Sequence, residues 1–136
     1  MGLRIMRGIM ALAAMMAMCE LAPAAETYPT RPIRFVVPFT PGALNDLLAR
    51  LIGEQLGTRL GQRVIVDNRP GAGTMLGSDL VAKSNPDGHT LLLASAPLAI
   101  NPSLYPNVPF DATRDLAGVT HIGSLPFVLV VNPKSA

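Results

Sequence analysis

The sequence predicts an α/β fold in which a parallel-type sheet is flanked by helices on both faces. Apolar, β-branched runs alternate along the chain with segments whose apolar residues recur every three or four positions. Turns rich in glycine and proline separate these segments. Strands that alternate with helices are joined by right-handed crossovers, which place helices on both faces of one sheet. The 136 residues are enough for one domain of this kind and too few for two.

The first expected elements are a strand, a helix and a second strand. Residues 32–37 are β-branched and aromatic and predict a buried strand, and residues 64–66 predict the second. Between them we expect a helix with Asn45 as its N-cap and Gly61 as the residue that ends it. The residues expected to face the sheet from this helix are Leu47, Leu48, Leu51, Ile52, Leu56 and Leu60.

A second helix and a third strand complete the repeating unit. Residues 69–73 predict a loop, and residues 74–84 predict a helix that turns Leu76, Leu80 and Val81 inward. After a turn, residues 90–94 predict a third strand, apolar on both faces as expected for the centre of a parallel sheet.

The last part of the chain predicts one short helical turn and two more strands. The turn is expected around residues 102–105, and the strands at residues 117–122 and 127–131. The final strand is strongly apolar, and no element follows it to cover a face. We therefore expect the chain to be a piece of something longer.

The first 24 residues are typical of a signal peptide. Arg4 and Arg7 precede an apolar stretch at residues 8–18, and Ala22-Pro23-Ala24 offers the small residues that a signal peptidase reads. This stretch reaches about half of the roughly 20 residues that a membrane-spanning helix needs. We therefore expect cleavage after Ala24 and export to the periplasm. Loss of Arg4, Arg7 and Glu20 would lower the formal charge from +2 to +1.

Several functional classes are disfavoured by the residues present. A nearly neutral chain without a cluster of basic residues argues against nucleic-acid binding. The sequence lacks a P-loop and a complete dinucleotide fingerprint, and neither His89 nor His121 has the partners that a metal site needs. A small hydrolase would need a nucleophile with a base, and Ser95 has no base beside it in the sequence. We expect no cofactor, no metal and no enzymatic activity.

Three loops are candidates for ligand binding because each follows a predicted strand and opens a helix or helical turn. They are residues 38–46, 69–74 and 95–101. The carboxyl ends of parallel strands form the crevice in which α/β proteins bind ligands, and free N–H groups at helix N-termini favour anions. This predicts a carboxylate site, although the glycines in these loops could serve tight turns alone. Asp46 would repel a carboxylate, so support of the helix N-terminus is an equally good role for it.

The sequence resembles the extracytoplasmic solute receptors of tripartite tricarboxylate transporters, also called Bug proteins. The resemblance runs from Tyr28 to about Ser135, nearly the whole chain after the leader. The motifs that carry it are Tyr28-Pro29, Arg31-Pro32-Ile33-Arg34, Val37-Pro38-Phe39, Pro41-Gly42 with Asp46, Gly61-Gln62 with Val64, Asn68-Arg69-Pro70-Gly71-Ala72-Gly73, Pro86-Asp87-Gly88-His89-Thr90-Leu91-Leu92, Ile100-Asn101-Pro102-Ser103-Leu104-Tyr105 and Val128-Leu129-Val130-Val131.

The resemblance implies a two-lobed periplasmic binding protein of type II, the Venus-flytrap fold. Residues 25–136 would form an incomplete first lobe that ends near the connection to the second. The function implied is capture of a small carboxylate, by a monomer, for delivery to a membrane permease. Family ligands are held largely by backbone N–H groups and waters of the first and third loops. The residues expected to bind ligand are Phe39, Pro41, Gly42, Ala43, Asp46, Ser95, Ala96 and Leu98.

The chain departs from the family pattern at both of these loops. Ala43 stands where a second glycine is usual, and the third loop is more apolar than the usual version, which favours apolar or aromatic acids as ligands. An alternative is that the chain is a truncated or split gene product that binds no ligand. Cooperative unfolding would count against that alternative.

Overall fold

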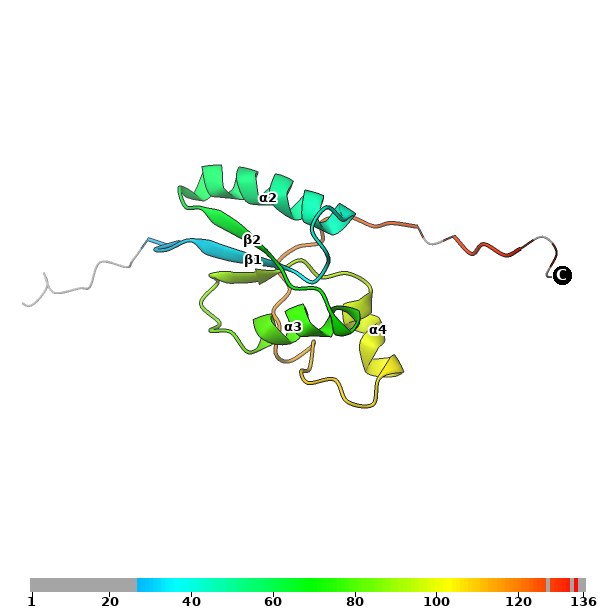
Figure 1. The fold of residues 1–136 in the computed structure, drawn as a ribbon. Coiled ribbons are helices and arrows are strands. Elements are labelled where there is room, and N and C mark those ends of the chain that lie inside the picture. The colour runs from blue at the N-terminus through cyan, green and yellow to red at the C-terminus, as the bar shows by residue number, and fades with distance from the viewer. Residues whose placement is uncertain (1–26, 127, 133, 135–136) are drawn as a thin grey trace, which may run out of the picture.

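The structure, a computed structural model, describes residues 27–126, 128–132 and 134 (Figure 1). Its sheet consists of the parallel strands β1 (Ile33–Val37), β2 (Val64–Asn68) and β3 (Thr90–Leu92), in the order β2-β1-β3. The expected signal peptide, residues 1–24, lies outside the described residues.

Strand β1 lies at the centre of this sheet. It pairs with β2 from Ile33 opposite Val64 to Val37 opposite Asn68, and with β3 over three residues on its other side. Its sequence Ile-Arg-Phe-Val-Val is almost wholly buried because both faces are covered. The first two predicted strands are confirmed. The third was expected at the centre, which is wrong for the described sheet, where β3 is at the edge.

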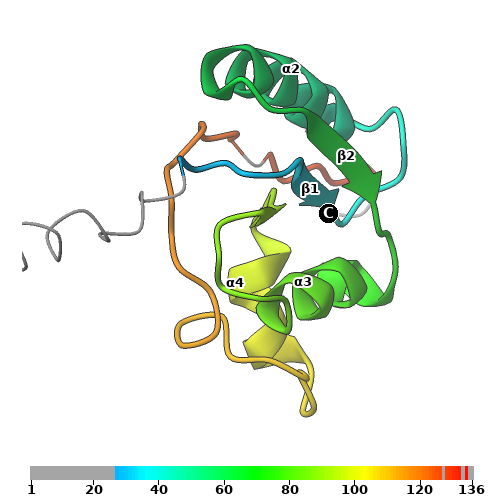
Figure 2. The ribbon, with the colours of Figure 1, turned by 90° about the vertical axis from the view of Figure 1, so that its left-hand side faces the viewer.

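Helices cover both faces of the sheet. Helix α2 (Leu44–Leu60) lies on one face, and α3 (Met75–Ala82) lies on the other beside α4 (Pro97–Leu104) (Figure 2). Strands β2 and β3 flank β1 on opposite sides. The connection from β1 to β2 and the connection from β2 to β3 run in opposite directions across the sheet. Because both have the same hand, their helices lie on opposite faces. The predicted class, a parallel α/β sheet between helices, is confirmed.

The face that α2 turns to the sheet differs from the predicted stripe. Leu47 and Leu51 are 54% and 63% exposed, whereas Ala49 and Gly53 are buried. A Cβ on Gly53 would lie 3.2 Å from a Val64 methyl group, so the helix backbone runs close to β2. The other members of the stripe are partly buried: Leu48, Ile52, Leu56 and Leu60.

The two ends of α2 test the predicted caps differently. Gly61 ends the helix at φ +67, the left-handed conformation that glycine adopts without strain, as predicted. Asn45 as N-cap is wrong, because α2 begins at Leu44 and Ala43 holds the N-cap position without a side-chain cap bond.

The second predicted helix corresponds to a 3₁₀ turn, η2 (Ala72–Thr74), followed by α3. Val81 is buried as expected, but Leu76 is 56% exposed and Ser78 is buried in its place. The predicted helical turn near residue 102 is a full helix, α4, which starts at Pro97. Proline suits the first position of a helix because its missing N–H would have no helical partner there.

The two strands expected after α4 are absent from the described residues. Residues 117–122 and 128–131 have no strand partner there, and Val128 to Val131 are 68–91% exposed; Phe127 lies outside the described residues. An apolar, β-branched run becomes a strand only where a neighbour supplies the ladder of hydrogen bonds. Within the described ranges, no helix is long and apolar enough to cross a membrane.

Candidate functional site

The structure brings the three predicted loops together at the carboxyl edge of the sheet. The N–H of Arg69, just after β2, donates to the Val37 carbonyl at 2.8 Å, and the N–H of Leu93, just after β3, donates to the Val36 carbonyl at 2.9 Å. The strand order reverses at β1, so the chains that leave β1 and β3 are adjacent. In open α/β sheets this switch point is where ligands bind.

The expected site residues lie on the first and third loops. Pro41 and Gly42 are exposed between β1 and α2. Asp46, in contrast, is buried, with 3% of its surface accessible. The remaining expected residues are partly buried: Phe39, Ala43, Ser95, Ala96 and Leu98.

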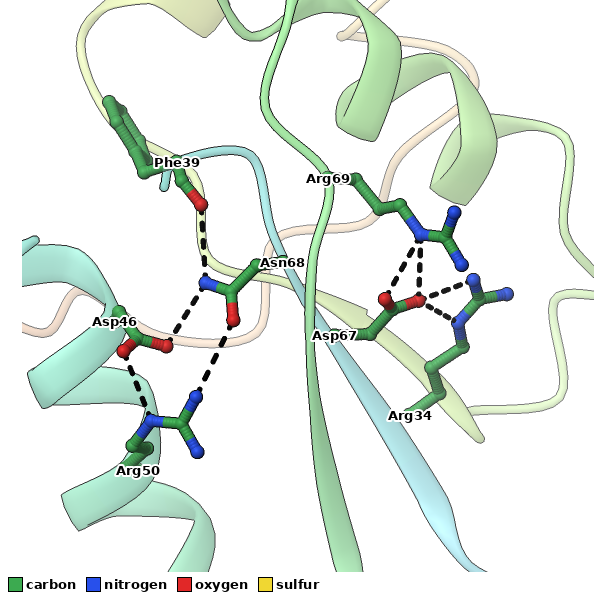
Figure 3. Close-up of polar contacts among 7 residues, drawn as sticks. All are labelled: Arg34, Phe39, Asp46, Arg50, Asp67, Asn68 and Arg69. Carbon is green, nitrogen blue, oxygen red and sulfur yellow. Dashed lines mark hydrogen bonds and ion pairs between the residues drawn. The ribbon is translucent and has the colours of Figure 1, made fainter. Parts of the chain in front are cut away.

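The Asp46 carboxylate is held inside the protein by three donors. It accepts hydrogen bonds from Arg50 Nε at 3.0 Å and from Asn68 Nδ2 at 3.0 Å (Figure 3). It also accepts one from the Gly42 N–H at 2.9 Å. The bond from Arg50, followed by those from Gly42 and Asn68, lowers the pKa of Asp46 from 3.8 to about 2, against the opposing effect of burial. Asp46 is therefore charged at neutral pH, and its hydrogen bond with the Gly42 N–H anchors the first loop.

Asn68, the last residue of β2, is a part of the site that the sequence reasoning missed. Its Nδ2 also donates to the Phe39 carbonyl at 3.1 Å, and its Oδ1 accepts from Arg50 Nη2 at 3.5 Å (Figure 3). Val64 and Val66 pack against the core beneath α2, and side chains alternate along a strand. That alternation places Asn68 on the α2 face and could have identified it.

Several backbone donors that were expected to meet the ligand have partners within the protein. The N–H of Gly42 bonds to Asp46, the N–H of Ala43 to the Thr40 carbonyl at 3.3 Å, and the N–H of Leu98 to the Ser95 carbonyl at 2.9 Å. The N–H groups of Leu44 and Asn45 belong to the first turn of α2, where a helix supplies no acceptors. The α2 N-terminus is therefore the part of the first loop best suited to an anion.

The second loop is held in a strained backbone conformation. Ala72 and Thr74 have φ values of +47 and +77, which non-glycine residues rarely adopt. The buried Asn101 of α4 donates from Nδ2 to the Gly73 carbonyl at 2.8 Å, and Ser78 Oγ donates to the Thr74 carbonyl at 3.0 Å. These two side chains hold the loop against α3 and α4.

Gly77 of α3 is packed against both the first and the second loop. A Cβ at this position would lie 2.9 Å from the Arg69 carbonyl oxygen and 2.9 Å from Pro38 Cβ. Only a residue without a side chain allows this approach. The spacing between the two loops therefore depends on Gly77.

Arg69 binds a carboxylate of the protein itself. Asp67 accepts hydrogen bonds from Arg69 Nε at 3.0 Å and from Arg34 Nε at 2.7 Å (Figure 3). Burial acts to raise the pKa of Asp67, but hydrogen bonds and charge from Arg34 and Arg69 outweigh it, so the pKa is lowered. The guanidinium of Arg69, a residue of the second loop, is thus paired with Asp67 and not with a ligand.

Two shallow hollows lie along α2, at a distance from these loops in the chain. One, of about 400 Å³, is lined by residues from Gly53 to Val64, and the other, of about 380 Å³, by residues from Leu51 to Arg59. Neither includes a residue of the three loops, and both are open to solvent. The described residues contain no group of three His, Cys, Asp or Glu side chains that could hold a metal ion.

Residues 48–136 match a family model described as the tripartite tricarboxylate transporter family receptor. The chain belongs to this family. The resemblance found in the sequence motifs is thereby confirmed, and the family is one of receptors.

Two curated proteins are similar to this chain over most of its length. Protein BugT of Bordetella pertussis is 51% identical over 112 residues, which are 81% of this chain and 34% of BugT. A UPF0065 protein in the tcbD-tcbE intergenic region of Pseudomonas sp. strain P51 is 46% identical over 110 residues, 81% of this chain and 33% of that protein. The chain spans about a third of the length of these curated relatives.

Solved structures show the same fold. The periplasmic binding protein BugD is 42% identical with a TM-score of 0.60, over 62% of this chain and 28% of BugD. MatC of Rhodopseudomonas palustris, solved with bound malate, is 35% identical with a TM-score of 0.57, over 65% of this chain and 30% of MatC. Rpa4515 of R. palustris, solved with adipate, is 36% identical with a TM-score of 0.61, over 63% of this chain and 29% of that chain. The chain therefore has the fold of part of a periplasmic binding protein.

Proposed function

We propose that the receptor captures a small carboxylate in the periplasm and delivers it to a membrane permease of the tripartite tricarboxylate type. The observation that carries the proposal is the position of the α2 N-terminus and of the loop after β3, which flank the switch point of the sheet. Support comes from two relatives, solved with malate and with adipate, both small dicarboxylates.

The proposed site is one wall of a ligand crevice. A ligand carboxylate would meet the first-turn N–H groups of α2, where the positive end of the helix dipole lies. The partly buried, apolar Ala96 and Leu98 would contact the hydrocarbon part of the acid. Asp46 would hold the first loop in place from inside the protein. The residues proposed to line the crevice are Phe39, Pro41, Gly42, Ala43, Ser95, Ala96 and Leu98.

We further infer the organisation of the receptor around this site. Residues 1–24 would direct export and be removed, and residues 25–136 would form the N-terminal portion of the first lobe of a monomeric binding protein. In two-lobed binding proteins, hinge closure traps the ligand between the lobes. The relatives, of which the matched part of this chain covers about a third, have room for a second lobe.

The test is a thermal melt of the full chain with malate, adipate and benzoate, each beside its uncharged amide. A ligand that binds only the folded state adds about 2.7 kcal/mol of stability at one hundred times its Kd. We expect at least one acid to raise the melting temperature and its amide to leave it unchanged. A cooperative melt that no acid shifts would refute the proposal for this chain. A non-cooperative melt would favour a truncated product without ligand binding.

A further inference from the structure

We propose that Asn68 is a positioning residue of the ligand site, which holds the first loop in the shape that presents the α2 N-terminus to a carboxylate. The inference rests on the proposed function. Asn68 would act through the loop and touch no ligand itself.

Asn68 is attached to the first loop at more than one point. Its two Nδ2 protons serve two acceptors, the Phe39 carbonyl at 3.1 Å and Asp46 Oδ1 at 3.0 Å. Asp46 passes the constraint on, since its Oδ2 accepts the Gly42 N–H at 2.9 Å. The start, the middle and the end of the loop are thereby attached to the end of β2. Figure 3 shows the bonds that Asn68 makes to Phe39 and Asp46.

The first loop has little regular hydrogen bonding of its own to fix its shape. Gly42 has φ +82, and the contact between the Ala43 N–H and the Thr40 carbonyl is long, at 3.3 Å. A segment with few regular hydrogen bonds opens locally at low cost. A loop that must be ordered when ligand binds lowers the affinity, whereas a loop ordered beforehand does not.

The contacts of the Asn68 side chain require a carboxamide. Both groups that Asn68 Nδ2 contacts are acceptors, a carbonyl and a carboxylate. A carboxamide supplies two donors to them, whereas a carboxylate of the same shape supplies none and would repel Asp46. Strand β2 gives the carboxamide a rigid base, because Asn68 is paired with Val37 at the carboxyl edge of the sheet.

The decisive variant is Asn68→Asp, which keeps the shape and reverses the hydrogen bonding. Asn107→Asp at an exposed position is the control for the added charge. Asn68→Ser, which keeps one donor, is a second variant for the case that Asn68→Asp fails to fold. The readouts are amide hydrogen exchange without ligand and the Kd for malate and adipate by calorimetry, both on the full chain.

We expect Asn68→Asp to speed exchange of the Gly42 amide and to raise the Kd of the bound acid, each by about tenfold or more. Asn68→Ser should give a smaller change in both, while exchange in β1 and the control variant match the wild type. The double swap Asp46→Asn with Asn68→Asp restores a donor and acceptor pair, and should recover part of the Gly42 protection.

Two results would overturn the proposal in distinguishable ways. If the wild type binds an acid and the Asn68 variants leave the Kd and the Gly42 exchange unchanged, the positioning role is wrong and the proposed function stands. If the wild type binds neither malate nor adipate, the proposed function fails for these acids and the ligand role of Asn68 fails with it.

Discussion

Replacing Gly77 by alanine tests whether α3 sets the spacing between the first and second loops. The new Cβ would lie 2.9 Å from the Arg69 carbonyl oxygen, 2.9 Å from Pro38 Cβ and 3.1 Å from Pro38 Cα. These atoms belong to backbone or to a proline ring, so they cannot move aside as a flexible side chain would. The loops or the helix must shift.

The size of the effect follows from two opposing contributions. Alanine is favoured over glycine inside a helix by about 1 kcal/mol, whereas overpacking a tight contact costs about 1–3 kcal/mol. The steric cost should be near its upper end, because two contacts fall below the ordinary limit for a Cβ. We expect the free energy of unfolding to fall by about 1–2 kcal/mol. Each kcal/mol corresponds to roughly 4 °C in melting temperature for a domain of this size.

The assay is urea unfolding followed by circular dichroism at the helix band. Gly53→Ala is the matched control, since Gly53 is also a buried helix glycine but its nearest neighbour, at 3.2 Å, is a Val64 methyl group that can move. If the urea midpoint of Gly77→Ala equals or exceeds that of the wild type, the close contact has no net cost and the reasoning is refuted.

Three further predictions concern the loops and the core. Asn101→Ala removes the buried bond to the Gly73 carbonyl and should lower the unfolding free energy by about 1–2 kcal/mol; an unchanged urea midpoint would contradict this. The pKa of Asp46 is lowered from 3.8 to about 2, so the stability that its charge gives the fold is complete above pH 3.8 and is lost as the pH falls through 2. Asp46→Asn should lack this loss of stability in acid. Urea midpoints of the wild type and the variant that superimpose at every pH from 2 to 6 would contradict this. Phe35→Ala empties a core site that is 4% exposed and should cost about 3–5 kcal/mol in the same unfolding assay, and a loss below 1 kcal/mol would show that the core is elsewhere.

Features set by local chemistry were predictable from the sequence. The β-branched run of β1, which ends at Pro38, and the left-handed Gly61 need only their own neighbours to be recognised. The meeting of the three loops was also predictable, because parallel strands end at one edge. The expected roles of the loop residues in binding stay predictions.

Features set by distant neighbours were not predictable in the same way. Apolar periodicity ranks leucines above small residues, so it favoured Leu47 and Leu51, while Ala49 and Gly53 form the face where the helix backbone approaches β2. Residues 117–122 have strand character but no strand partner in the described part of the chain. The hydrogen bond from Asn68 to the Phe39 carbonyl joins residues 29 positions apart. Alternation along β2 indicates the face on which Asn68 lies but does not reveal this partner.

Binding of a carboxylate at the carboxyl edge of the sheet can be observed residue by residue with amide NMR during titration with malate or adipate. We expect the amide signals of residues 42–46 and of Ser95, Ala96 and Leu98 to shift together and to saturate with one Kd. Saturable shifts confined to the hollow between Gly53 and Val64, or no saturable shift with either acid, would contradict it.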